Sequence, residues 1–117
     1  MFIKNNRLTN EKDILHTQKN GVSFFTKFFV VKYNPNNLPN TRFTILVSKK
    51  VCKKAAVRNK IKRIVREILK DNVKQIKSGL DIVISTSKNC LDENEKIKKD
   101  EIKQTIRFII DKSGIKL

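Results

Sequence analysis

The chain has 117 residues, of which 38% are hydrophobic, so it can bury one modest core but is too short for two ordinary domains. Its 27 lysines and arginines outnumber the 11 aspartates and glutamates, and the net charge of +16 favours a polyanionic partner, above all nucleic acid. No acidic residue occurs between Asp13 and Glu67, so the positive charge is concentrated in the first half of the chain.

Cysteine usage and hydropathy exclude other classes of protein. Cys52 and Cys90 are far apart without CxxC spacing, and His16 is the only histidine, so we expect neither a zinc site nor a disulfide framework. The N-terminal residues lack the apolar run of a signal peptide, and no stretch approaches the ~20 apolar residues that span a bilayer. We therefore expect a cytoplasmic protein with reduced thiols and no membrane partner.

The first elements follow from capping and turn residues. Asn10, with acidic residues after it, and Gly21 predict a short helix over about residues 10–19. Residues 24–33 and 42–48 are rich in aromatic and β-branched side chains, and a turn-forming stretch separates them. This pattern predicts two strands joined by a loop, and the first region is long enough to divide into two strands. Within it we expect Phe24 and Phe25 to be packing residues.

The second half of the chain begins with the clearest helix. Its apolar positions recur with the period of one helical face and are Val57, Ile61, Ile64, Val65, Ile68 and Leu69. Residues 80–85 read as a buried strand, and Leu91 leads into a last amphipathic helix. We expect Asp92, Glu93 and Glu95 to cap the start of that helix. Its apolar positions are Ile97, Ile102, Ile106, Phe108, Ile109 and Ile110. The predicted order is α-β-β-(β)-α-β-α.

The long helix also carries a basic face. Arg58, Lys62 and Arg66 are spaced i, i+4, i+8 and form one ridge, while Lys60, Arg63 and Lys70 lie further round, opposite the apolar stripe. Like charges at this spacing cost roughly 0.2–0.5 kcal/mol per pair, so a phosphate-bearing partner is one explanation for them. A simple solvated face is the other, although such faces normally interleave acids with bases.

The segment around this ridge resembles the bacterial ribonuclease P protein family. The residues that match its arginine-asparagine-arginine signature are Arg58, Asn59, Lys60, Ile61, Lys62 and Arg63, followed by Arg66 and Glu67. Further matches occur before the helix at Val47, Ser48, Lys49, Lys50 and Val51, near the N-terminus at Asn6, Arg7, Leu8 and Asp13, and in the strands at 21–23, 29–31 and 81–84. The resemblance covers essentially the whole chain. Lys60 departs from the signature, because lysine keeps the charge but lacks the bidentate fork of arginine.

The resemblance implies a two-layer α/β (α+β) sandwich, with about four strands and three helices in a single RNA-binding domain over residues 1–117. It also implies an uncommon left-handed crossover around the long helix. The implied activity is endonucleolytic removal of the 5′ leader from precursor tRNA, with Mg²⁺ used by a catalytic RNA subunit. The implied partners are ribonuclease P RNA and precursor tRNA. We expect no metal on the protein itself, no catalytic residue and no small-molecule substrate.

On this resemblance, phosphate contacts are expected from the basic residues of the long helix and of the segments before it. The expected RNA-binding residues are Arg7, Lys49, Lys50, Lys53, Lys54, Arg58, Asn59, Lys60, Lys62, Arg63 and Arg66. The amide of Asn59 suits either an RNA contact or a hydrogen bond at the helix start, and both roles stay open.

The resemblance also implies a cleft for the single-stranded leader, on the concave side of the sheet between the first helix and the long one. The expected cleft residues are Ile14, Gln18, Val30 and Lys32. The family commonly has aromatic residues at the positions of Ile14 and Gln18, and glutamine cannot stack a base as they do. Two strand faces compete for the cleft, and the family pattern assigns it Val30 and Lys32, since lysine is a poor core residue.

Three other functions are compatible with parts of the sequence. A ribosomal or other structural RNA-binding protein fits the charge and size equally well, and only the whole-chain resemblance decides against it. A self-sufficient nuclease would need paired carboxylates or histidines, and His16 stands alone. A DNA-binding module would need a helix-turn-helix or a dimerising heptad, and neither pattern is present.

Overall fold

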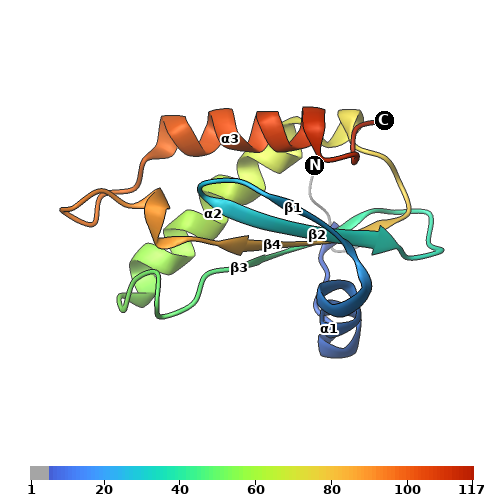
Figure 1. Cartoon of the computed structure of the whole chain (residues 1–117), viewed down its shortest axis with the longest axis horizontal. Helices are drawn as coiled ribbons and strands as arrows, with labels where there is room; N and C mark the ends of the chain where they lie inside the picture. The colour runs from blue at the N-terminus through green and yellow to red at the C-terminus, as the bar shows by residue number, and fades with distance from the viewer. Residues whose placement is uncertain (1–5) are drawn as a thin grey trace.

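The computed structural model describes residues 6–117 (Figure 1). Its elements are α1 (Glu11–Asn20), β1 (Val22–Phe25), β2 (Phe29–Pro35), β3 (Arg42–Leu46), α2 (Ala55–Asp71), β4 (Leu80–Thr86) and α3 (Lys99–Lys112), with short 3₁₀ turns η2 (Val73–Gln75) and η3 (Lys88–Cys90). The predicted order of helices and strands is confirmed, with the first strand region divided in two. Within residues 6–117, no helix combines the length and apolarity needed to cross a membrane.

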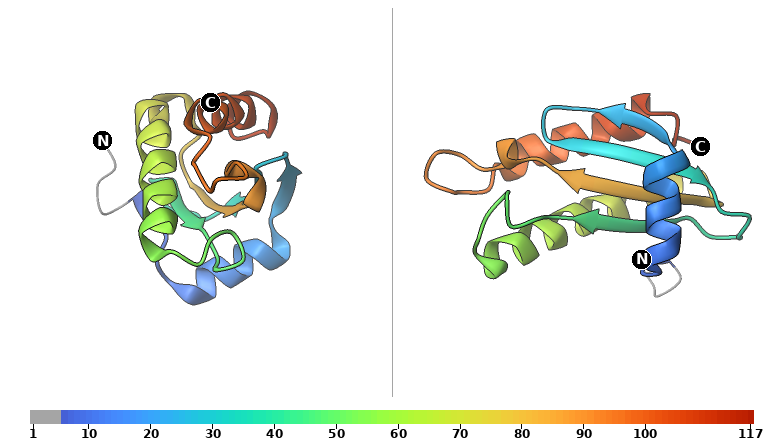
Figure 2. Two further views of the ribbon diagram at one scale, coloured as in Figure 1. Left: turned by 90° about the vertical axis from the view of Figure 1, so that its left-hand side faces the viewer. Right: turned by 60° about the horizontal axis from the view of Figure 1, so that its bottom comes forward.

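The four strands form one mixed sheet in the order β1-β2-β4-β3. β1 and β4 both pair antiparallel with β2, while β3 pairs parallel with β4. β2 and β3 are consecutive in sequence but are not hydrogen-bonded, because β4 lies between them. The connection from β3 through α2 to β4 is left-handed, as Figures 1 and 2 show, and so belongs to the rare exceptions to the right-handed rule.

Local side-chain chemistry fixes the beginning of the fold. The Asn10 Oδ1 atom accepts hydrogen bonds from the backbone N–H of Lys12 and of Asp13, at 2.9 and 3.3 Å, and so caps α1. After α1 the chain turns at Gly21, where a Cβ atom would lie 2.5 Å from the Thr17 carbonyl oxygen. A residue with a side chain would push α1 and β1 apart there.

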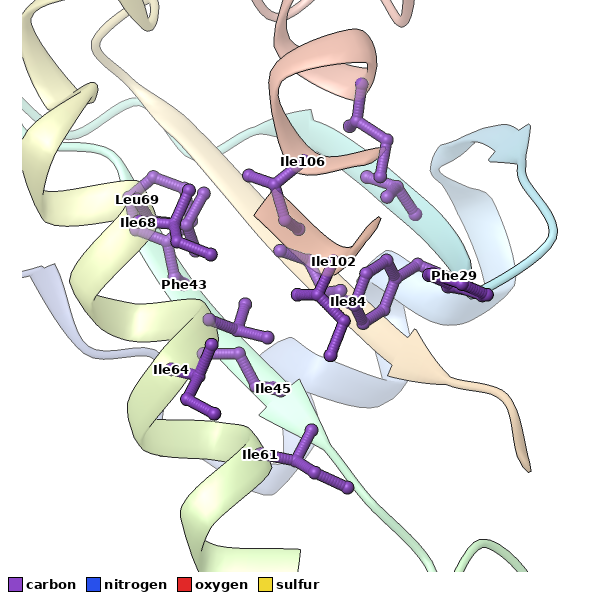
Figure 3. Packing of buried hydrophobic residues seen from close by; sticks show 14 of the residues in the cluster. Phe29, Phe43, Ile45, Ile61, Ile64, Ile68, Leu69, Ile84, Ile102 and Ile106 are labelled. Carbon is purple, nitrogen blue, oxygen red and sulfur yellow. The ribbon is translucent and has the colours of Figure 1, made fainter. Parts of the chain in front are cut away.

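The core lies between one face of the sheet and the pair α2 and α3 (Figure 3). The sheet contributes Phe29, Val31, Phe43, Ile45, Ile82 and Ile84, α2 contributes Ile61, Ile64, Val65, Ile68 and Leu69, and α3 contributes Ile102, Ile106, Ile109 and Ile110. The predicted apolar faces of both helices are therefore confirmed, with three exceptions. Val57 is only partly buried, Ile97 is partly buried and lies before the start of α3, and Phe108 is 53% exposed.

The expected start of the last helix was wrong. α3 begins at Lys99, and the acids before it belong to a tight turn closed by the bridge between Leu91 and Ile97. The Asp92 carboxylate accepts hydrogen bonds from the backbone N–H of Asn94 and Lys96, at 2.8 and 2.9 Å. A short acidic side chain that bonds to nearby backbone offers the chain an alternative to the helix, and here that alternative prevails.

Candidate nucleic-acid interface

The sheet face opposite the core is crossed by α1, which packs against β2 and β4 (Figures 1 and 2). Cross-strand pairing arranges the side chains of this face in three rows. The first row is Phe25, Val30, Ser85 and Leu46, the second is Ser23, Lys32, Val83 and Thr44, and the third is Asn34, Asp81 and Arg42. Val83 and Asp81 are buried, whereas every residue of the first row is partly or largely exposed. We call this first row the open strip.

Polar contacts fix α1 over the second and third rows. Arg42 holds Asp81 through two hydrogen bonds of 2.8 and 2.7 Å, and its Nη2 also lies 3.3 Å from an Asp13 carboxylate oxygen. The hydrogen bond to Asp81 is the largest cause that raises the pKa of Arg42. One turn further along α1, Thr17 Oγ1 donates to Asn34 Oδ1 at 2.8 Å. The helix is thus docked, and the open strip remains beside it.

The expected cleft residues lie around this strip. Ile14 and Gln18 are half-buried on α1, and Val30 belongs to the strip itself. The Lys32 ammonium donates to the Gln18 carbonyl oxygen at 3.0 Å, so it fastens the last turn of α1 to the sheet. The expected place of the cleft, between the first helix and the long one, was wrong. α1 and α2 lie on opposite faces of the sheet, so the open strip does not lie between them (Figure 2).

Of the two phenylalanines of β1, only Phe25 differs from expectation. Phe24 does pack, with its ring centroid 6.1 Å from that of Phe108 on α3. Phe25 is 70% exposed, because it is paired with Val30 and therefore points to the face that α1 leaves open. Strand alternation alone predicts that the two rings point to opposite faces of the sheet. It does not predict which of these faces stays open.

The basic ridge lies on one flank of α2, where Arg58, Lys62 and Arg66 are all half-buried. Residues 6–8 lie along the outer edge of β3, since Arg7 forms a bridge with Phe43. Burial lowers the pKa of Arg66, and the nearby charge of Arg7 lowers it further. In the part of the chain that the structure describes, neither arginine forms a salt bridge. Adjacent cations without a carboxylate favour an external anion.

Arg58 has a structural task beside its charge. Its Nη1 donates to the carbonyl oxygens of Cys52 and Lys53, at 2.9 and 2.8 Å. These bonds hold the loop between β3 and α2, which presents four exposed lysines, Lys49, Lys50, Lys53 and Lys54. Arg58 therefore connects the predicted ridge to the loop that carries the predicted loop cations.

The other signature positions are spread around α2. Asn59 and Arg63 are exposed on its outer side, and the helix is preceded by Lys54 as N-cap. Among residues 6–117 no side-chain hydrogen bond involves Asn59, so the helix-start role has no support and the RNA contact stays a prediction. Lys60 lies apart from the ridge. It lines a hollow of about 440 Å³ together with Ile97, which closes the turn that begins at Leu91.

The remaining reactive side chains do not assemble into a site. Cys52 and Cys90 are buried free thiols, and burial raises the pKa of Cys90 to about 11. His16 is exposed, with Nδ1 3.1 Å from the Asn20 amide. Over residues 6–117 there is no group of three or more histidine, cysteine or acidic side chains that could hold a metal ion. The candidate interface instead offers the cations of the ridge and of the loop before α2, together with an open sheet face.

Comparison with known proteins gives consistent matches. The family model for ribonuclease P matches residues 2–110. The ribonuclease P protein component of Thermotoga maritima is 38% identical over 96 residues, which is 82% of this chain and 81% of that protein. The component from Clostridium botulinum is 31% identical over 114 residues, covering 97% and 98% of the two chains.

Solved structures agree with these matches. The ribonuclease P protein from Thermotoga maritima superposes with a TM-score of 0.78 at 34% identity, covering 89% of this chain and 94% of that one. The protein from Staphylococcus aureus gives a TM-score of 0.82 at 26% identity, with 94% and 96% covered. Sequence and fold thus point to the same family.

Proposed function

The chain belongs to the bacterial ribonuclease P protein family, as a subunit of that ribonucleoprotein endoribonuclease, and we propose that it binds both the catalytic RNA and the 5′ leader of precursor tRNA. Family membership decides against the ribosomal alternative. In this proposal the RNA subunit performs the Mg²⁺-dependent cleavage of the leader, and the protein supplies binding energy and position.

One observation carries the proposal. A ridge of cations without salt bridges among the described residues lies on α2 beside the β3 edge of the sheet, and the sheet face opposite α2 keeps an open strip. Arg7 links the two, because it is close to Arg66 on α2 and is bridged to β3. The ridge suits the phosphates of a structured RNA, and the salt dependence of binding follows from counterion release. The open strip suits the bases of a single strand, which need exposed apolar or aromatic side chains rather than further charge.

The test is cleavage of a precursor tRNA by a bacterial ribonuclease P RNA at low Mg²⁺, with and without the protein. We expect the wild type to restore cleavage of the leader. The double variant Lys62→Ala/Arg66→Ala should need about tenfold more protein for the same rate, because two phosphate contacts are lost. Arg58 is left in place, since its removal would also release the loop before α2.

The matched control is Lys74→Ala/Lys77→Ala, which removes the same charge from exposed positions beyond the end of α2. This control should behave like the wild type. If both double variants lose activity equally, only the net charge matters and the ridge has no special role. If the wild type binds the RNAs but never stimulates cleavage, the proposed function is wrong.

A further inference from the structure

A second open hollow lies at the β1 edge of the sheet, opposite the edge formed by β3, and is lined by residues of β1, of the turn after it and of α3. Figure 2 shows that this turn lies near α3. The volume of the hollow is about 450 Å³, within the ordinary range of ligand pockets. The lining residues are Phe25, Thr26, Lys27, Gln104, Thr105 and Phe108. None of them is acidic, and none belongs to the residues expected to bind RNA.

The hollow exposes two aromatic rings to solvent. Phe25 is 70% exposed and Phe108 is 53% exposed, although the chain has only eight aromatic residues in total, seven phenylalanines and one tyrosine. Exposed rings that lie together mark an interaction site more often than scattered apolar residues do. Phe108 is held in place by its contact with Phe24, so its ring is presented on a rigid support.

The polar groups of the hollow fit a nucleotide. Lys27 supplies a cation at the turn, and its Nζ lies 5.8 Å from the centroid of the Phe28 ring. The Nζ of Lys98 lies at the same distance from that ring, so two ammonium groups flank this end of the molecule. The Gln104 amide can donate and accept, and the Thr105 hydroxyl, which donates to the Glu101 carbonyl oxygen, still has acceptor capacity.

The hollow is also continuous with the open strip. Phe25 belongs to both, because it ends the row formed with Val30, Ser85 and Leu46 and also lines the hollow. A single strand lying along the strip therefore meets the hollow as it passes the edge of the sheet at β1. Base stacking on phenylalanine tolerates any sequence, which suits a strand whose sequence varies.

We propose that this hollow is a nucleotide subsite for single-stranded RNA, with Phe25 and Phe108 as stacking surfaces and Lys27 as the phosphate contact. The inference rests on the proposed function, since the strand that reaches the hollow is the leader of precursor tRNA. The subsite holds a leader nucleotide further from the cleavage site than those on the strip, because it lies at the β1 edge, whereas the ridge that binds the catalytic RNA in this proposal lies beside β3.

The test uses the holoenzyme and precursor tRNAs whose leaders are lengthened one nucleotide at a time. For the wild type, affinity should rise by about five- to tenfold at the length that first reaches the hollow, as expected for one stacked base. Phe25→Ala and Phe108→Ala should each remove most of this rise. With shorter leaders Phe108→Ala should match the wild type, because Phe108 lies outside the open strip, and this separates the subsite from the proposed function as a whole.

Val22→Ala is the matched control, because Val22 is a 57% exposed apolar residue on the same strand and does not line the hollow. This variant should keep the full rise. The subsite is overturned if the two phenylalanine variants keep the rise as well, or if Val22→Ala loses it equally. If the wild type stimulates cleavage at no leader length, the proposed function and the subsite both fail.

A second measurement observes binding directly. The chain contains no tryptophan, so Phe25→Trp places a single indole in the hollow. Oligouridylate should quench its fluorescence by stacking, and Phe108→Ala in the same protein should weaken that binding severalfold. The alternative occupant is a second copy of the chain. In that case the wild type should self-associate in sedimentation, Phe25→Ala should abolish the self-association, and oligouridylate should leave the indole fluorescence unchanged. This combined result would make the hollow a protein contact and the proposal wrong.

Discussion

Arg42 on β3 and Asp81 on β4 are direct neighbours across the sheet and share two hydrogen bonds, from Nε and Nη2, of 2.8 and 2.7 Å. Their side chains are 21% and 7% exposed, and Asp13 of α1 approaches the same guanidinium at 3.3 Å. The pair therefore joins the strand that borders the basic ridge to the helix that borders the open strip. Both parts of the interface depend on it.

Asp81→Ala should lower the free energy of unfolding by about 2–4 kcal/mol, because a largely buried arginine then keeps only the longer contact with Asp13. Urea denaturation followed by circular dichroism measures this. Asp111→Ala is the control, since Asp111 pairs with Lys116 at 3.4 Å where both side chains are about half exposed. It should cost less than about 0.5 kcal/mol. Similar losses in the two variants would contradict a structural role for the Arg42 pair.

Arg58→Lys separates the structural task of this residue from its charge. The variant keeps the positive charge but loses the guanidinium Nη1, which donates to the carbonyl oxygens of Cys52 and Lys53. We expect RNA affinity to fall severalfold while the slope of log affinity against log salt stays unchanged. Lys62→Ala should instead reduce that slope by about one.

The two slopes are measured by titrating ribonuclease P RNA with each variant over a series of salt concentrations. Hydrogen exchange supplies the structural readout, and backbone amides of the loop before α2 should exchange faster in Arg58→Lys only. An unchanged loop combined with a reduced slope in Arg58→Lys would show that Arg58 acts on RNA directly.

Cys90 should make stability depend on pH in the alkaline range. Burial raises the pKa of its thiol from 9.0 to about 11, so between these values the unfolded chain loses the proton while the folded chain keeps it. The unfolded state then binds fewer protons, and the free energy of unfolding falls as pH rises. The contribution is fully present below about pH 9 and is lost as pH approaches about 11.

Comparison with Cys90→Ala isolates this effect, because lysine titration is common to both proteins. Wild type should lose on the order of 1–2 kcal/mol relative to the variant over this range, measured by urea unfolding at several pH values. Curves that stay parallel from about pH 8 to about pH 11 would show that burial leaves the thiol unperturbed.

The sequence predicted those parts of the fold that local rules decide. The period of Ile61, Ile64 and Ile68 identified the buried face of α2, because helical geometry sets that spacing whatever the partner. Asn10 identified the start of α1 for the same reason. The left-handed crossover came from family resemblance, since hydrophobic period contains no information on handedness.

The errors concern long-range contacts. Phe24 and Phe25 are equally apolar, and only the docking of α1, through residues distant in sequence such as Arg42 and Asn34, decides which face of β1 stays open. The hydrogen bond from Lys32 Nζ to the Gln18 carbonyl oxygen likewise depends on where α1 ends above β2. The sequence thus suggests candidate site residues by type, whereas the contacts that they make depend on the tertiary structure.

Gln18→Phe tests whether α1 borders the path of the leader. Gln18 is half-buried on α1, and its contact with Lys32 uses the backbone carbonyl, which the substitution leaves in place. A ring at this position should strengthen binding of precursor tRNA by about threefold or more, because stacking on a base adds to the apolar contact. Binding of mature tRNA, which has no leader, should stay the same.

Gln18→Leu is the control for this prediction, because leucine adds apolar surface without a ring. It should gain less than Gln18→Phe, so the difference between the two variants measures stacking alone. Equal gains in affinity for precursor tRNA would mean that the leader makes apolar contacts with α1 but does not stack on it. No gain in either variant would place the path of the leader along the open strip toward Phe25, away from the last turn of α1.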